Sequence, residues 1–145
     1  MTVLLLALVL GTPAFAAEPG EAPVAVSPDA SVKVKKDVIT ADGVEVGSLR
    51  KEPGMMGCFT VVGADGTDLL FFKWISEPFQ YMEAYKASDL DTLVFDAPAD
   101  MAFKKIIAKR LVQAGVLTAG APDQAALDTY AKKAGTEQTR LRQGM

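Results

Sequence analysis

Apolar positions alternate with polar ones, or gather in short runs, from Val32 to about Asp96. Two Asp-Gly pairs, Asp42-Gly43 and Asp65-Gly66, separate successive apolar runs. Such a pair favours a two-residue hairpin turn, because Asp and Gly both tolerate positive φ. We therefore predict a series of antiparallel strands over this part of the chain.

The first hairpin is tested by its register. A two-residue turn at Asp42-Gly43 pairs Ala41 with Val44 and Ile39 with Val46. These four apolar residues then share one face, as a half-buried hairpin requires.

The second hairpin is apolar on both faces. A turn at Asp65-Gly66 pairs Val62 with Leu69, Val61 with Leu70, Thr60 with Phe71, and Phe59 with Phe72. One face is then a core of Phe59, Val61, Leu70, Phe72 and Trp74. The opposite face carries Val62, Leu69 and Phe71, beside Cys58, Thr60 and Lys73. Leaving that second face in water is costly, at ~25 cal/mol per Å². We expect it to be covered by the first hairpin folding across it, or else to be an interaction face for a partner or a second copy of the chain.

Two further strands and two helices complete the pattern. The strands are expected over Gln80–Lys86 and Thr92–Asp96. The first helix runs from Pro98 or Met101 to Ala114 on an apolar stripe that includes Ile107 and Leu111, with Gly115 as its C′ residue. The second begins near Pro122 and ends at Gly135. The sequence thus predicts an α+β fold: an antiparallel β-meander of five to six strands, followed by two C-terminal helices packed on one sheet face.

The N-terminus has the pattern of a cleavable signal peptide over residues 1–16. An apolar run, Val3–Leu10, precedes the small-residue site Ala14-Phe15-Ala16. This run is far shorter than the ~20 residues that span a bilayer. The predicted organisation is a signal peptide (1–16), a flexible Pro- and Ala-rich linker (17–31), one domain (32–135) and a polar tail (136–145). The predicted location is outside the cytoplasm, in a periplasm or the medium of a bacterium.

Composition excludes several chemistries. The 145 residues include no His and one Cys, and the formal net charge is −3. Ser-His-Asp and Cys-His nucleophilic sites, CxxC redox pairs and Cys-rich metal sites are therefore absent from this sequence. Mild acidity gives no indication of a nucleic-acid partner or of a polybasic lipid-binding patch. No cofactor is predicted.

Two clusters could carry chemistry. Carboxylates at Asp89, Asp91, Asp96 and Asp100 suit a hydrolase only if two converge, and each also suits a turn or a helix cap. Met55, Met56 and Cys58 offer soft ligands for Cu(I) or a redox-active thiol, with Lys73 expected opposite Cys58. The alternative is that these residues fill a loop at the sheet edge.

The function predicted from these features is an exported, non-enzymatic module that binds a protein partner or associates with the envelope. Two alternatives remain open: a small hydrophobic-ligand-binding protein and a carboxylate-based hydrolase. No catalytic residue is assigned.

Overall fold

The computed structural model describes the backbone of residues 22–77 and 80–143, and the side chains of these residues up to Thr136. The predicted signal peptide and residues 17–21 of the predicted linker lie outside the described residues. Seven strands form one antiparallel sheet in the order of the chain. They are β1 (Val32–Lys35), β2 (Val38–Ala41), β3 (Val44–Lys51), β4 (Phe59–Gly63), β5 (Asp68–Ile75), β6 (Tyr81–Lys86) and β7 (Asp89–Pro98).

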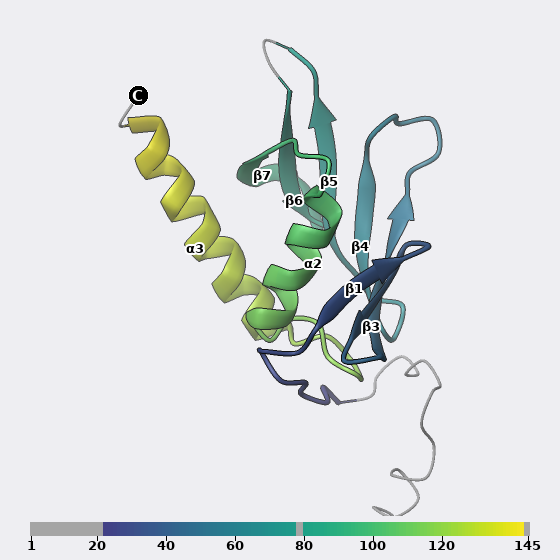
Figure 1. The fold of residues 1–145 in the computed structure, drawn as a ribbon. Helices are drawn as coiled ribbons and strands as arrows, with labels where there is room; N and C mark the ends of the chain where they lie inside the picture. Colours follow the sequence, from purple (N-terminus) through teal and green to yellow (C-terminus); the bar gives the residue numbers. More distant parts are fainter. Residues whose placement is uncertain (1–21, 78–79, 144–145) are drawn as a thin grey trace, which may run out of the picture.

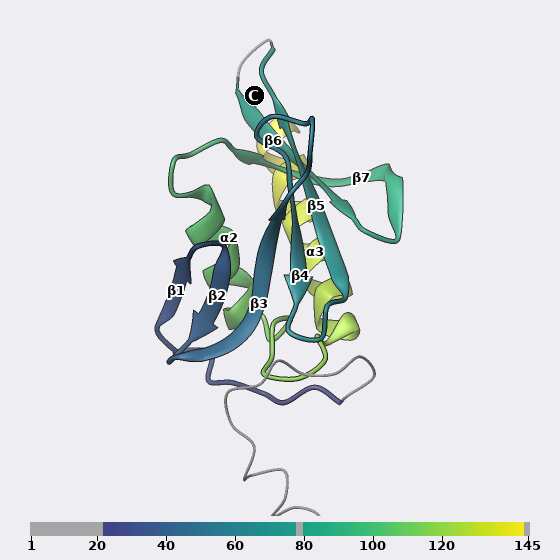
Figure 2. The ribbon, with the colours of Figure 1, turned by 90° about the vertical axis from the view of Figure 1, so that its right-hand side faces the viewer.

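Two helices follow the sheet, α2 (Phe103–Gln113) and α3 (Gln124–Gln143). Both lie on the same side of it: α2 packs against β1, and α3 packs against β7 (Figure 1). Figure 2 shows how β1 and β2 curl toward α2. The predicted α+β meander with two C-terminal helices is confirmed, with seven strands in place of five or six. The β1–β2 turn escaped prediction because Lys36 and Asp37 adopt positive φ, 52° and 63°, without a glycine.

The core lies between the sheet and the helices, and aromatic rings fill its centre. Phe72 is fully buried, and its ring stacks on Phe59 at 5.2 Å between centroids. Phe103 of α2 meets the Phe72 ring edge-on at 5.1 Å. Edge-to-face and offset-stacked pairs of this kind add about 0.5–1.5 kcal/mol each beyond simple burial.

The first hairpin pairs Ala41 with Val44 as predicted, through Asp42 and Gly43 at positive φ. The predicted Ile39–Val46 pair is wrong, because a bulge shifts the register and Ile39 pairs with Gly47. The predicted buried face survives in part: Ile39, Ala41 and Val46 are buried, whereas Val44 is exposed.

The second hairpin pairs Phe59 with Phe72, Thr60 with Phe71 and Val61 with Leu70, as predicted. The predicted Val62–Leu69 pair is wrong. The turn is longer than expected: Gly63 bonds to Thr67, and Gly66 alone takes a positive φ of 88°. Val62 therefore pairs with Asp68, and Leu69 becomes the extra residue of a bulge.

These shifts change the face that was expected to carry Val62, Leu69 and Phe71. Leu69 is fully buried within the main core, Val62 is buried, and Phe71 is half-buried beside Tyr85. The first hairpin does not fold across this face; it continues the sheet beside β4. Arg50 instead reaches from β3 past β4 to Asp68 on β5, with two hydrogen bonds of 2.9 Å.

The end of α2 and the start of α3 follow local rules, whereas the N-cap position of α2 is Ala102, which makes no side-chain capping bond. At the end of α2, the N–H groups of Gly115 and Val116 donate to the carbonyls of Val112 and Leu111, a Schellman arrangement around the predicted C′ residue Gly115. Asp123 caps α3 by accepting the Ala126 N–H at 3.0 Å. The expectation that this helix ends at Gly135 is wrong, since α3 continues to Gln143.

Part of the expected linker belongs to the contacts of the domain. The N–H of Val24 donates to Thr118 Oγ1 at 3.3 Å, and Val24 accepts from the Ala119 N–H at 2.9 Å. The chain therefore runs along the α2–α3 connection before it enters β1. No helix in the described part of the chain is both long enough and apolar enough to span a bilayer.

Candidate functional site

A hollow of about 870 Å³ opens at one end of the sheet, where the β3–β4 loop meets the segment that joins β7 to α2. All four methionines among the described residues line it: Met55, Met56, Met82 and Met101. The sole tryptophan of the chain, Trp74, and the sole cysteine, Cys58, line it as well. We call this feature the methionine hollow.

The β3–β4 loop owes its shape to two successive turns. The Met55 N–H donates to the Glu52 carbonyl at 3.2 Å, and the Cys58 N–H donates to the Met55 carbonyl at 3.0 Å. Gly57 has a φ of 77° and lies against Trp74, where an added Cβ would come within 3.0 Å of Trp74 Cβ. Only glycine combines this backbone conformation with so close an approach. The β3–β4 loop therefore packs against Trp74 at Gly57.

The floor of the methionine hollow is rigid and apolar. Phe59, Met82 and Phe103 line it and are buried. The rings of Phe59 and Phe103 lie 6.0 Å apart, edge to face. This aromatic packing fixes the floor in one arrangement.

The rim is open to water and combines exposed methionines with charged side chains, among them Lys51 and Asp100. Met55 is 42 % exposed, Met56 81 % and Met101 106 %. Flexible, polarisable thioethers suit a surface that adapts to different apolar groups. Lys104 stands at the edge of the hollow, with its Nζ 5.4 Å from the centroid of the Phe59 ring.

The three predicted soft-metal residues, Met55, Met56 and Cys58, all line the methionine hollow. Their thioethers and thiol remain the ligand types that suit Cu(I). Cys58 is buried, and its Sγ lies 3.7 Å from the Met56 carbonyl. The β4–β5 ladder ends at Phe59–Phe72, so the expected Cys58–Lys73 pairing is not formed. Among the described residues, no group of three His, Cys, Asp or Glu is arranged to hold a metal.

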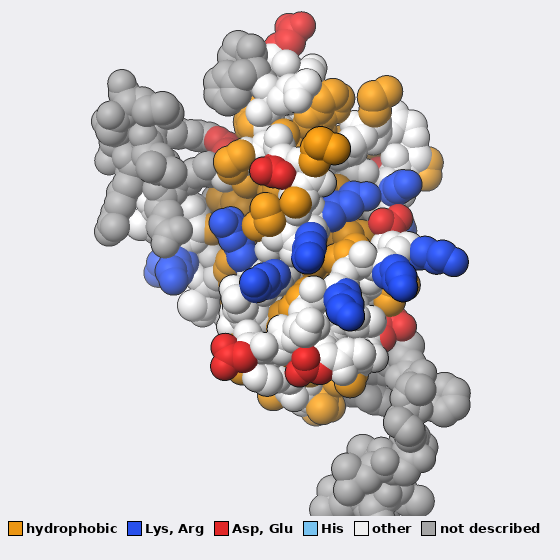
Figure 3. Space-filling view, in the orientation of Figure 1, with side chains coloured by type: hydrophobic (Ala, Val, Ile, Leu, Met, Phe, Trp, Pro, Cys, Tyr) orange, Lys and Arg blue, Asp and Glu red, His pale blue; other side chains and the backbone are white. Residues whose placement is uncertain are grey.

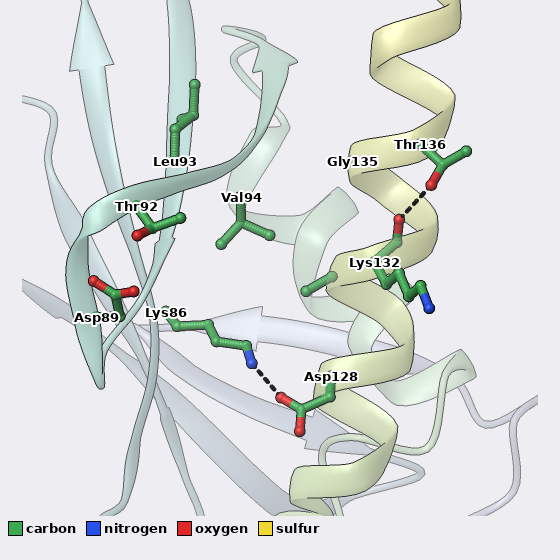
Figure 4. Close-up of a pocket in the computed structure, with 10 residues that line it drawn as sticks. Lys86, Asp89, Thr92, Leu93, Val94, Asp128, Lys132, Gly135 and Thr136 are labelled. Atoms are coloured by element: carbon green, nitrogen blue, oxygen red, sulfur yellow. Dashed lines mark hydrogen bonds and ion pairs between the residues drawn. The ribbon is translucent and has the colours of Figure 1, made fainter.

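A second hollow, of about 510 Å³, lies between the β6–β7 hairpin and α3 (Figure 4). Asp89 and Asp128 both line it. Asp89 accepts the Asp91 N–H at 3.2 Å within its own turn, and Asp128 forms an ion pair with Lys86. Asp100 likewise accepts the Ala102 N–H at 2.8 Å. Asp89 and Asp100 thus have the local partners that their turn positions predict, and Asp128 has Lys86 as its partner.

The outer face of the sheet, turned away from the helices, carries a polar and aromatic cluster on β6. Tyr85 donates to Glu83 Oε1 at 2.8 Å, and Tyr81 donates to Glu83 Oε2 at 3.4 Å. Burial, assisted by the bond to Glu83, raises the pKa of Tyr85 from its ordinary value of 10.0 to about 12. The cluster fixes the Tyr85 ring beside Phe71, at 6.3 Å between ring centroids.

Sequence reasoning found two of the four methionines that line the methionine hollow, together with its cysteine. It singled out Met55, Met56 and Cys58, because they are adjacent in the chain. It missed Met82 and Met101, which come from β6 and from the segment before α2. The available signal was the small number of methionines, but their convergence depends on the tertiary fold. A scan against protein-family models and searches of curated proteins and of solved structures give no match for this chain.

Proposed function

We propose that this protein is an exported, non-enzymatic binding module, and that the methionine hollow receives apolar side chains of a protein partner. The observation that carries the proposal is the convergence of all four described methionines and the sole tryptophan on one opening. Monomers seldom leave a contiguous apolar surface of this kind in water unless it has an interaction role.

The division between floor and rim supports a protein partner over an enclosed small ligand. Small-molecule sites bury most of the ligand in a preformed pocket. Here Phe59 and Phe103 give a fixed base, whereas Met56 and Met101 project into water. A rigid base with a flexible methionine rim is the arrangement that peptide-binding surfaces use to accept varied side chains.

The test is NMR with ¹³C-methyl-labelled methionine, which reports on Met56, Met82 and Met101 separately. Short uncharged peptides bearing Leu or Phe are titrated into the protein, and the same peptides with Ser replacing those residues serve as the ligand control. Saturable shifts of the three methyl resonances are expected with the apolar peptides alone. Shifts with a fatty acid but with no peptide would instead support the small-ligand alternative.

Matched variants locate the site. The double variant Met56→Glu, Met101→Glu should weaken peptide binding by at least about tenfold, because two carboxylates replace exposed methionines of the rim. Leu90→Glu is the control, since Leu90 is 57 % exposed and lies outside the methionine hollow. Equal effects of both variants, or no peptide-induced shift at all, would refute the proposal.

Export is the other part of the proposal, and it rests on the Val3–Leu10 run and the Ala14-Phe15-Ala16 site. Mass spectrometry of the natural product should find Ala17 at the amino terminus. An intact Met1 form recovered from the cytoplasm would contradict it.

A further inference from the structure

The charges of this acidic chain are strongly segregated. Elements β1, α2 and the part of α3 up to Thr136 carry eight Lys or Arg side chains and a single acidic one, Asp128. Their formal charge is therefore +7, and since the whole chain carries −3, the remainder carries −10. The basic residues are Lys33, Lys35, Lys104, Lys105, Lys109, Arg110, Lys132 and Lys133.

The fold brings the basic residues of α2 and α3 to one side of the molecule, and Lys33 and Lys35 project from the edge strand β1 beside α2. Helix α2 lies between β1 and α3 on the same side of the sheet (Figure 1). Its buried residues, including Ile107 and Leu111, face the core, which leaves Lys105 and Lys109 exposed. Figure 3 shows the Lys and Arg side chains as a band across this side, with few acidic groups among them. We call this side the basic face.

Two of the acidic groups near the basic face are engaged in ion pairs. Asp37 lies 3.6 Å from Lys104, and Asp128 pairs with Lys86. Within the described part of the chain, the other six lysines of the basic face make no ion pair. Their charge is available to an external anion.

An exposed apolar group stands at the edge of the basic face. Met101 is fully exposed immediately before α2, and the adjacent Lys104 lines the methionine hollow. Figure 3 shows orange apolar surface directly beside the blue band. Lysines next to a protruding apolar side chain are typical of proteins that rest in the interface of an anionic bilayer.

From this segregation of charge we propose that the lysines of the basic face dock the protein onto an anionic phospholipid membrane. This inference goes beyond the proposed function. Protein partners bind at the methionine hollow, whereas the lysines hold the whole module at the lipid surface. A partner anchored in the same membrane would then meet the hollow at short range.

The physics sets the expected strength. Each Lys or Arg near an anionic bilayer contributes roughly a fivefold increase in binding. The attraction acts within a Debye length, about 8 Å at physiological ionic strength. Charges more than a Debye length from the lipid are largely screened, so the charge of the basic face matters more for docking than the net charge of −3.

The test is co-sedimentation with lipid vesicles, using the chain from Ala17 onward, which contains all the strands and helices of the described residues. One set is pure phosphatidylcholine, and the other contains about a quarter phosphatidylglycerol. Binding is expected only to the anionic vesicles, and it should weaken as salt is raised from about 0.05 M to about 0.5 M. Equal binding to both vesicle types, or binding to neither, would overturn the proposal.

Charge reversal locates the surface. Lys109→Glu changes the charge of the basic face by two units and should weaken vesicle binding about 25-fold. Lys73→Glu is the matched control, because Lys73 is exposed on β5 next to Phe72 and points away from the helices. It alters the net charge equally and should leave binding unchanged. A thermal melt of each variant confirms folding, and equal losses in both would refute the assignment.

A last arm separates lipid from other anions. If the protein ignores anionic vesicles but binds soluble polyglutamate through Lys109, the basic face serves an acidic protein and the membrane proposal is wrong. The vesicles contain no protein, and the peptides that probe the methionine hollow carry no charge. Either proposal can therefore fail without the other.

Discussion

Tyr85 is half-buried on the outer face of β6, where its hydroxyl donates to Glu83. Its pKa of about 12 in the folded state exceeds the ordinary value of 10.0. The folded state therefore holds the phenolic proton more tightly than the unfolded state does. The stability that this proton contributes is fully present below pH 10 and is lost as the pH rises from 10 toward 12.

The contribution of Tyr85 to the urea denaturation midpoint should therefore be constant up to about pH 9. The midpoint should then fall toward pH 12. Tyr85→Phe removes the titrating hydroxyl and should flatten that part of the profile. Tyr130→Phe provides a tyrosine control away from Glu83. Ultraviolet absorbance of tyrosinate gives a direct check: a Tyr85 transition near pH 10 would contradict the raised pKa.

Residue-level prediction succeeded where one side chain determines a turn and failed where the backbone absorbs an extra residue. Asp42-Gly43 correctly placed the first turn, because both residues take positive φ. Asp65-Gly66 looked identical in sequence, yet Asp65 accepts the Thr67 N–H at 3.0 Å and gives a longer turn. The bulge at Leu69 then restores the register that the sequence predicted beyond it. The alternation of apolar and polar residues does not indicate where such a bulge occurs.

At the scale of elements, Gly135 shows how the same residue can have opposite meanings. A glycine after a lysine pair is a common helix end, yet α3 continues through it. A Cβ at this position would lie 2.8 Å from the Val94 carbonyl oxygen of β7. Gly135 therefore allows the helix to approach the strand, a role that depends on tertiary packing and is invisible to local pattern.

The two interpretations of Gly135 predict opposite effects of Gly135→Ala on the free energy of unfolding. In an unconstrained helix, alanine is favoured over glycine by about 1 kcal/mol. Here the clash with Val94 should outweigh that gain and lower the free energy of unfolding by roughly 1–3 kcal/mol. Thr136→Ala, at the exposed neighbouring position, should change it by only a few tenths. Chemical denaturation measures both, and a stabilised Gly135→Ala protein would show that α3 does not press on β7.

At the scale of the whole molecule, the sequence predicted the architecture but not the surface. Meander order and helix placement follow from turn spacing and apolar stripes, which are local. The basic face is assembled from Lys33 and Lys35, from Lys105 and Lys109, and from the Lys132-Lys133 pair. These positions lie far apart in the chain, so a net charge of −3 conceals them. Met82 and Met101 of the methionine hollow could not be predicted for the same reason.

The strand order also has a consequence for how the chain matures. Every strand pairs with its neighbour in sequence, so paired strands are joined by short loops. Contacts between residues this close in the chain favour rapid folding of the sheet. Its cover is distant: Val24 bonds to Thr118 across 94 positions, and α2 follows all seven strands. Synthesis proceeds from the N-terminus, so the strands that carry Phe59 and Phe72 are made before the helices that cover them. Aggregation therefore competes with folding most strongly in the interval before residues 103–113 emerge.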